Sequence, residues 1–376
     1  MFPKSDSSVP GVLEPGDSGP AARRALLDWL ALQAALGRDA ERACGLLSRL
    51  RDPAAALRAA PDVSGPARTR LEAWIEALRR SGAVGLPLLS ELYPARLARL
   101  RDPSPLLWVI GDPAALSLPS VAIVGSRAAT AYGLRVARAF AGELARAGLV
   151  VVSGLARGID AAAHRGALEA GGRTVAVQAC GPDRVYPAAH RELAARIAER
   201  GALVTEMPPG TPPMRHLFGL RNRLISGLAA TLLVVEARVR SGTFLTVRHA
   251  LEQNVDVFAI PGPIDAPASA GPNRLLRDGA HTALEPADLL LRYGLLPAPD
   301  RERGRTREKR PAEQAILAAL AHEPATRDEL GRRLRRPPEQ LALALIELEI
   351  EGRVVEDRDG RLRAIEVSTP PGRRRS

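Results

Sequence analysis

Three residues that follow a buried β-type run have the chemistry of a phosphate site. The apolar run 120–124 is followed by Gly125, Ser126 and Arg127, and a helical pattern begins near residue 131. Glycine allows close backbone approach, serine offers a hydroxyl, nearby helix N–H groups suit a phosphate, and the arginine fork matches phosphate oxygens. The spacing is not GxGxxG, so no dinucleotide cofactor is predicted. The alternative is a purely structural glycine turn.

A second polar turn follows the next apolar run, and we expect it to extend the same anion-binding rim. Ser153, Gly154 and Arg157 stand after the run LVVV and open another helical pattern. Asp160 and His164 lie one helical turn apart and have the residue types of a catalytic pair. We interpret Asp160 instead as capping or charging the helix start, and His164 as a packing residue.

The densest polar cluster follows a proline-rich stretch near residue 210. We expect its aromatic residue to lie on a loop, and two of its arginines to begin the next helix and face one channel. Base stacking on an aromatic ring contributes roughly 1–3 kcal/mol and tolerates any sequence, while arginine–phosphate contacts supply salt-dependent affinity. The alternative is a solvated charge run, which the ring among the arginines disfavours. The predicted ligands of nucleic acid in this cluster are Arg215, Phe218, Arg221, Asn222 and Arg223.

One more small-residue turn, Ser241–Gly242, completes the predicted binding residues. No set of histidines, cysteines or carboxylates has metal-ligand spacing, and the sequence contains no nucleophile elbow or P-loop. We therefore predict no catalytic residue, no metal and no cofactor. The residues describe a binding groove better than an active site.

The elements that must position these residues alternate between strands and helices. Apolar β-branched runs separated by helical patterns predict an α/β fold, with an extended Rossmann-like, doubly wound sheet over residues 86–292. In such a sheet, ligands bind outside the carboxyl ends of the strands, where all of these motifs lie.

Smaller segments flank this domain. Residues 21–85 are helical throughout and contain a turn like that of a helix-hairpin-helix (SAM-like) module, although a small packing module is the preferred interpretation. Residues 312–367 have the pattern of three helices and a DG-turned hairpin, the order of a winged-helix domain. The other segments are predicted to be a disordered leader (1–20), a basic linker (293–311) and a disordered basic tail (368–376).

Composition limits the classes of function. The chain has 376 residues and a net charge of 53 − 42 = +11, which favours a polyanionic partner. Only Lys4 and Lys309 are lysines, so the charge also reflects a bias toward arginine. The two cysteines lack the spacing of metal ligands, which predicts a reducing, cytoplasmic compartment. The sequence contains no run of 18 apolar residues, so no membrane span is predicted.

The ordered motifs VAIVGSRAATAYG, VVSGLARGIDAAAHRGAL, LRNRLISGL and VVEARVRSGTFLT resemble those of the DprA/Smf family (DNA-processing protein A). The resemblance implies a Rossmann-like domain that binds single-stranded DNA (ssDNA) and forms a homodimer. It also implies protection of incoming ssDNA and help in loading the RecA recombinase during natural transformation.

The family's functional residues carry over motif by motif. Its Gly-Ser-Arg phosphate turn falls on residues 125–127, and its loop aromatic falls on Phe218. The basic residue three positions earlier falls on Arg215, and the Arg-Asn-Arg motif on residues 221–223. The chain departs from the family at Gly219, where a proline is usual, and this change is expected to loosen the loop that holds the aromatic ring.

Two other classes of function remain as alternatives. Related Rossmann-like enzymes of the phosphoribohydrolase type cleave nucleotides, but the stretches nearest to their PGGxGTxxE loop lack its glutamate. A duplex-DNA regulator would read DNA through the winged helix. The candidate recognition helix carries several acidic residues and no arginine or lysine, which favours a protein partner at that end.

Overall fold

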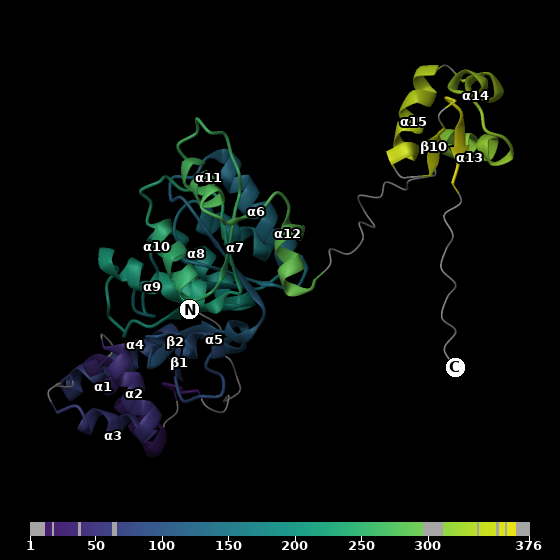
Figure 1. The fold of residues 1–376 in the computed structure, drawn as a ribbon. Helices are drawn as coiled ribbons and strands as arrows, with labels where there is room; N and C mark the ends of the chain where they lie inside the picture. The colour runs from purple at the N-terminus through teal and green to yellow at the C-terminus, as the bar shows by residue number, and fades with distance from the viewer. Residues whose placement is uncertain are drawn as a thin grey trace, which may run out of the picture. The chain divides into compact units, whose positions relative to one another are not determined.

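The computed structural model describes residues 12–16, 19–36, 39–61, 66–295, 311–336, 338–350, 353–357 and 359–365. The chain forms two compact units, residues 1–297 and 298–376 (Figure 1).

A mixed sheet forms the centre of the first unit, and it confirms the predicted α/β class. Among the described residues it has nine strands, in the spatial order β1-β2-β6-β5-β4-β3-β7-β8-β9. In this spatial order, all strands from β6 through β5, β4, β3, β7 and β8 to β9 are parallel to one another. Strand β2 is antiparallel to both β1 and β6. The strands are β1 (Val84–Pro87), β2 (Leu106–Gly111), β3 (Ser120–Val124), β4 (Val150–Ser153), β5 (Thr174–Val177), β6 (Ala202–Thr205), β7 (Thr231–Val234), β8 (Asp256–Ala259) and β9 (His281–Thr282).

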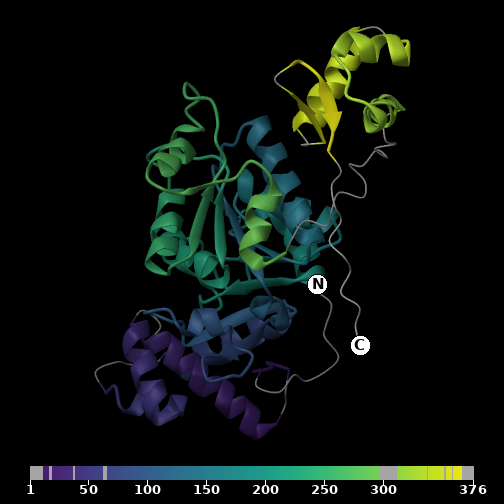
Figure 2. The ribbon, with the colours of Figure 1, turned by 45° about the vertical axis from the view of Figure 1, so that its right-hand side comes forward.

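Helices cover both faces of the parallel part of the sheet, as a doubly wound fold requires (Figure 2). One face packs against α6, α7 and α12, and the other against α5, α9, α10 and α11. In α6, Ala137, Phe140 and Leu144 form the apolar stripe that meets the sheet. The helices are α5 (Ala95–Ala98), α6 (Ala131–Arg146), α7 (Ile159–Glu169), α8 (Arg191–Arg200), α9 (Arg215–Leu228), α10 (Thr243–Glu252), α11 (Ala270–Arg277) and α12 (Pro286–Leu290), with 3₁₀ turns at Pro113–Ser117, Ala188–His190 and Leu291–Tyr293.

The N-terminal helices pack on the β2–β6 side of the sheet and share a core with α8. One polar residue joins the two parts: the buried Gln33 side chain donates to the carbonyls of Leu106 and Glu206 and accepts from the Trp108 indole N–H. The segment that resembles a helix-hairpin-helix turn spans residues 61–74; residues 62–65 of it lie outside the described residues, and a helix begins at Arg68. The helices are α1 (Pro20–Leu36), α2 (Ala40–Leu50), α3 (Pro53–Arg58) and α4 (Arg68–Ser81).

Part of the predicted disordered leader is ordered, so that prediction is wrong for residues 12–16 and for residues 19–20, where α1 begins. Leu13 pairs with Gly85 of β1 through two backbone hydrogen bonds of 2.8 Å, and the Pro15 carbonyl accepts from Arg79. The physical reason is that β1 is a short edge strand whose free backbone groups need partners. Composition alone does not reveal such a pairing.

The second unit has the element order predicted for a winged helix. Its elements are α13 (Pro311–His322), α14 (Arg327–Leu334), α15 (Pro338–Ile350), β10 (Val354–Glu356) and β11 (Leu362–Ala364). Ile316, Leu330, Leu345 and Leu348 form the centre of its core. The predicted basic linker falls mainly on residues 296–310 and the predicted tail on residues 368–376, all outside the described residues.

Candidate nucleic-acid interface

The predicted motifs meet at the carboxyl edge of the parallel strands. The loops after β3, β4, β5, β6 and β7 all leave the sheet at this edge. Strand order reverses between β3 and β7, because β4 to β6 extend the sheet on one side and β7 and β8 on the other. The carboxyl edge at such a switch point is where open α/β sheets bind ligands.

The turn after β3 uses its glycine and serine for internal packing. A side chain on Gly125 would lie 2.6 Å from Ile159 and 2.8 Å from the Glu236 carbonyl, so only glycine fits. The Ser126 N–H donates to the same carbonyl at 2.7 Å. Arg127 is the exposed member of the turn, and its guanidinium lies 4.9 Å from the centre of the Phe218 ring.

A carboxylate of the protein itself occupies the start of α6. The buried Glu236 side chain accepts from the Thr130 N–H at 2.9 Å and from the Thr130 hydroxyl. A Cβ at Gly133 would lie 2.3 Å from the carboxyl carbon, so this glycine makes room for the acid. A carboxylate at a helix N-terminus is held by the helix dipole and by free N–H groups. Glu236 and the Thr130 hydroxyl thus take the N–H groups of Thr130 and Gly133, and these two groups are not free to receive the predicted phosphate.

The second predicted turn contributes a single exposed side chain. Ser153 is fully buried and donates to the Ile123 carbonyl at 2.6 Å, and Gly154 is buried beneath the Arg221 guanidinium. Neither residue faces solvent, so their prediction as contacts of nucleic acid is wrong. Arg157 is exposed, and no described carboxylate forms an ion pair with it.

Arg221 is a buried structural cation. Only 3% of it is exposed, and its Nη1 atom donates to the Gly154 carbonyl at 2.8 Å and to the Val177 carbonyl. Asp160, which lies in the first turn of α7 as predicted, accepts from the backbone N–H of Gly154 and faces the guanidinium. Burial raises the pKa of Asp160 and lowers that of Arg221 to about 10, and each charge partly offsets the shift of the other.

Arg223 points away from Arg221, so the expectation of a shared channel is wrong. Its guanidinium forms ion pairs with Glu206 and, at 3.0 Å, with Asp102, and its side chain is 9% exposed. Both arginines lie in the middle of α9 rather than at its start. Positions two apart on a helix face different directions, which separates them. Asn222 lies between them, half-buried, and accepts from the Arg221 Nε atom at 3.2 Å.

Phe218 lies on α9, not on a loop as expected, and it is half-buried. Guanidinium groups of Arg127 and Arg221 lie 4.9 and 6.0 Å from its ring centre, within cation–π range. Tyr186 packs against it with ring centroids 5.6 Å apart and an angle of 54°. Because residue 219 belongs to the same helix, the glycine there does not loosen a loop.

Tyr186 is a residue that the sequence reasoning missed. It is 45% exposed although it contacts Phe218. The signal was its rarity: aromatic residues make up 3% of the chain, and this one stands in a loop after a strand.

Exposed arginines lie in the loops and at the helix starts of this same edge. None of the five forms an ion pair with a described carboxylate, and all follow the carboxyl ends of β3, β4, β6 or β7: Arg127, Arg157, Arg215, Arg238 and Arg240. The last two were not among the predicted ligands. They precede Ser241, whose hydroxyl accepts from the Thr243 N–H, and the exposed Gly242. The edge thus combines unpaired guanidinium groups with aromatic rings.

His164 packs in the interior, as predicted. It is fully buried, and its Nδ1 atom lies 2.6 Å from the Thr174 hydroxyl. That hydroxyl donates its one proton to the Val151 carbonyl, so Nδ1 carries the histidine proton and donates to the hydroxyl. The Nε2 atom has no hydrogen-bond partner among the described residues. Burial and nearby positive charge lower the pKa of His164 to about 3.

The buried histidine is expected to make folding sensitive to acid. Its folded pKa of about 3 lies below the unfolded value of 6.5, so its contribution is complete above pH 6.5 and is lost as the pH falls toward 3. At pH 5, which is 1.5 units below the unfolded pKa, the free energy of unfolding is lower by about 2 kcal/mol, at 1.36 kcal/mol per unit. Urea unfolding at pH 8 and pH 5 should show wild type losing about 2 kcal/mol more than His164→Leu. Equal losses would mean that the folded protein protonates this ring.

The described residues contain no group of three histidine, cysteine, aspartate or glutamate side chains that could hold a metal ion. None of the described helices is long and apolar enough to cross a bilayer. The chemistry that this edge offers is recognition of phosphate by guanidinium groups and of bases by aromatic rings.

Comparison with known proteins points to one family. The family model described as DNA recombination-mediator protein A matches residues 86–294, and the model of the DprA winged helix domain matches residues 297–360. Protein Smf from Escherichia coli is 41% identical over 275 residues, which cover 71% of this chain and 74% of that protein. DNA processing protein DprA from Bacillus subtilis is 39% identical over 216 residues, covering 57% and 73%.

Two solved structures are also similar. DNA processing protein A from Streptococcus pneumoniae has a TM-score of 0.57 and 32% identity, with 71% of this chain and 92% of that chain covered. DNA processing protein A from Helicobacter pylori, described by its unique single-stranded DNA binding mode, has a TM-score of 0.50 and 30% identity. That match covers 53% of this chain and 92% of the other.

Proposed function

The chain belongs to the DprA/Smf family, and on that premise we propose that it binds single-stranded DNA at the carboxyl edge of its Rossmann-like sheet. The observation that carries the proposal is the Arg127 guanidinium held 4.9 Å from the Phe218 ring. A phosphate can bind the arginine while a neighbouring base stacks on an aromatic ring. The solved relative from Helicobacter pylori, described by its single-stranded DNA binding mode, supports this ligand.

Single strands fit this edge better than a duplex. Stacking on Phe218 needs an unpaired base with a free face, which a duplex does not offer. The exposed arginines of this edge would neutralise phosphates and release counterions, so affinity should fall as salt rises. Neither interaction reads a base sequence.

The wider role that we propose is that of a cytoplasmic recombination mediator, which protects incoming ssDNA and helps load RecA during natural transformation. This role rests on the family resemblance. The winged-helix unit suits a protein partner better than duplex DNA, because α15 carries three glutamates and no arginine or lysine. An acidic helix suits a DNA groove poorly.

We also propose a homodimer built on the Rossmann-like domain. The strand β9 leaves an open sheet edge, and nearby Leu284 and Leu291 are 74% and 59% exposed. Open edges and exposed apolar side chains favour association. Deleting residues 296–376 should therefore leave a dimer in light scattering at micromolar concentration. A monomer of the shortened chain would argue against this interface.

The alternative function is nucleotide cleavage by an enzyme of the phosphoribohydrolase type. The structure gives one observation against it: the acid at the switch point, Glu236, is buried and held by Thr130, where it is not free for general acid–base work. We therefore propose a binding protein, not an enzyme. Incubation with nucleoside monophosphates followed by an assay for free base tests this directly, and release of base would support the alternative.

The experiment that tests the proposed function is a titration with labelled single-stranded and duplex DNA at two salt concentrations. Fluorescence anisotropy should show tighter binding of oligo-dT than of a duplex, with affinity falling steeply as salt rises. Equal affinity for both forms, or affinity that does not respond to salt, would count against the proposal.

Arg127→Ala is expected to weaken ssDNA binding and to lower the log–log salt slope by about 0.7, the value for one phosphate contact on a single strand. The reason is that this exposed guanidinium has no described carboxylate partner to neutralise it. Anisotropy across a salt series measures the slope. Arg146→Gln is the matched control, because this exposed arginine ends α6 at the opposite edge of the sheet. An Arg127→Ala protein that binds like wild type would remove the turn from the site.

A further inference from the structure

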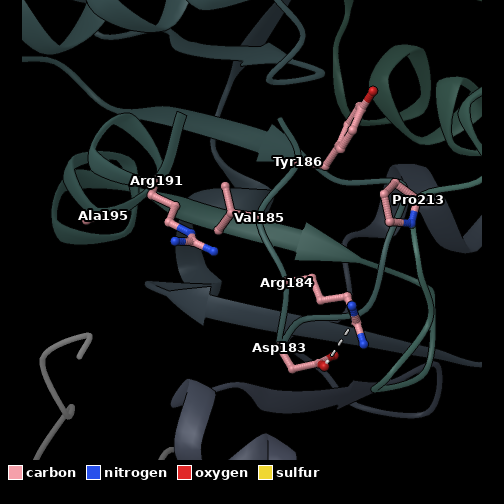
Figure 3. A pocket seen from close by; sticks show the side chains of 7 residues that line it. All are labelled: Asp183, Arg184, Val185, Tyr186, Arg191, Ala195 and Pro213. Carbon is pink, nitrogen blue, oxygen red and sulfur yellow. Dashed lines mark ion pairs between the residues drawn. The ribbon is translucent and has the colours of Figure 1, made fainter. Parts of the chain in front are cut away.

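A cavity of about 600 Å³ is lined in part by Tyr186, the ring that contacts Phe218. Ligand sites in proteins commonly have volumes of this order. It is lined by Asp183, Arg184, Val185, Tyr186, Arg191, Ala195 and Pro213 (Figure 3). These residues come from the loop after β5, the first turns of α8 and the loop before α9.

The lining has the chemistry of a nucleotide site. Val185, Ala195 and Pro213 supply an apolar surface, and Tyr186 supplies an exposed ring. In Figure 3, the tyrosine and Pro213 lie on one side of Val185 and the Arg191 guanidinium on the other. An apolar wall and an aromatic ring suit a base, while a guanidinium suits a phosphate.

The carboxylates around the cavity leave the Arg191 guanidinium free to bind a phosphate. Arg191 is exposed, and it forms no ion pair with any carboxylate of the described residues. The one acid in the lining, Asp183, is engaged by Arg184 at 3.6 Å and by the Gly210 N–H at 2.8 Å. The acid is thus held by the protein's own donors.

Hydrogen bonds between the two loops fix the shape of the cavity. The Gly210 N–H reaches Asp183, and the Gly181 N–H donates to the Thr211 carbonyl at 2.9 Å. A wall tied at two points loses little conformational entropy when a ligand binds, which favours affinity.

We infer that this cavity is a second nucleotide subsite. It takes the base and phosphate that follow those held at Phe218 and Arg127, so that the DNA strand runs from the turn after β3, across the two rings, to the start of α8. Tyr186 joins the subsites, because one ring contacts Phe218 and also lines the cavity. This inference rests on the proposed function, since it extends the same binding edge.

Photo-crosslinking tests the inference on the full chain. Oligo-dT that carries one 5-iodouracil is bound, irradiated and digested, and mass spectrometry should find the label on the peptide that contains Tyr186. Tyr186→Leu should weaken binding roughly 5- to 150-fold, the equivalent of one stacked base, whereas Tyr186→Phe keeps the ring and should bind like wild type. The substitution is tolerable because the side chain is 45% exposed.

The salt slope tests the phosphate part of the subsite. Arg191→Gln should lower the slope by about 0.7, and Arg146→Gln should leave it unchanged. The second subsite would be overturned if wild type binds ssDNA, Tyr186→Leu binds it with unaltered affinity and Arg191→Gln has an unaltered salt slope. The proposed function would then remain intact. Absence of ssDNA binding by wild type would instead overturn the proposed function.

Discussion

Arg221→Met is expected to destabilise the protein by about 3–5 kcal/mol, because it leaves the buried Asp160 carboxylate without its charge partner. The same change removes two hydrogen bonds to backbone carbonyls, those of Gly154 and Val177. Urea unfolding followed by circular dichroism measures the loss in free energy of unfolding.

The double variant Arg221→Met/Asp160→Asn separates charge from packing. With neither charge buried, it should be more stable than Arg221→Met alone. A folded Arg221→Met protein with wild-type stability and lost ssDNA binding would contradict the structural role and return this arginine to the list of phosphate ligands.

Phe218→Ala is expected to weaken binding of ssDNA by about 1–3 kcal/mol with little change in salt slope. Stacking on the ring releases no counterions, and the arginine beside the ring, which is expected to contact phosphate, is still present in the variant. The salt slope therefore stays nearly the same. The effect should be visible in anisotropy titrations with labelled oligo-dT across a salt series.

Phe218→Trp is the matched control, since it keeps an aromatic face at the same place on α9 and should retain most of the affinity. Circular dichroism shows whether each variant is folded. A Phe218→Ala protein that keeps full affinity, or one that loses affinity only through a smaller salt slope, would contradict a stacking role for the ring.

Most of the fold could be predicted from the sequence because local patterns encode it. Apolar β-branched runs such as 120–124 and 231–234 have no polar face, and only a sheet covered on both sides buries them fully. The helical stripe of α6 and the turn-bounded hairpin of the second unit are equally local signals. The short edge strands β1 and β9 and the pairing of Leu13 with Gly85 were missed, because backbone pairing at an edge leaves little trace in side-chain type.

The sequence by itself determined which residue types gather at the carboxyl edge: glycines, serines, arginines and an aromatic ring after successive strands. The sequence could not decide which of these residues face solvent. A motif such as Arg-Asn-Arg is the same whether its arginines bind phosphate or form ion pairs inside the protein. Tertiary structure decided that Arg221 and Arg223 point inward to Asp160 and Glu206, while Arg127 stays exposed beside Phe218. The physical reason is that burial depends on residues distant in sequence, and a guanidinium becomes structural only where the fold brings a carboxylate and carbonyls to meet it.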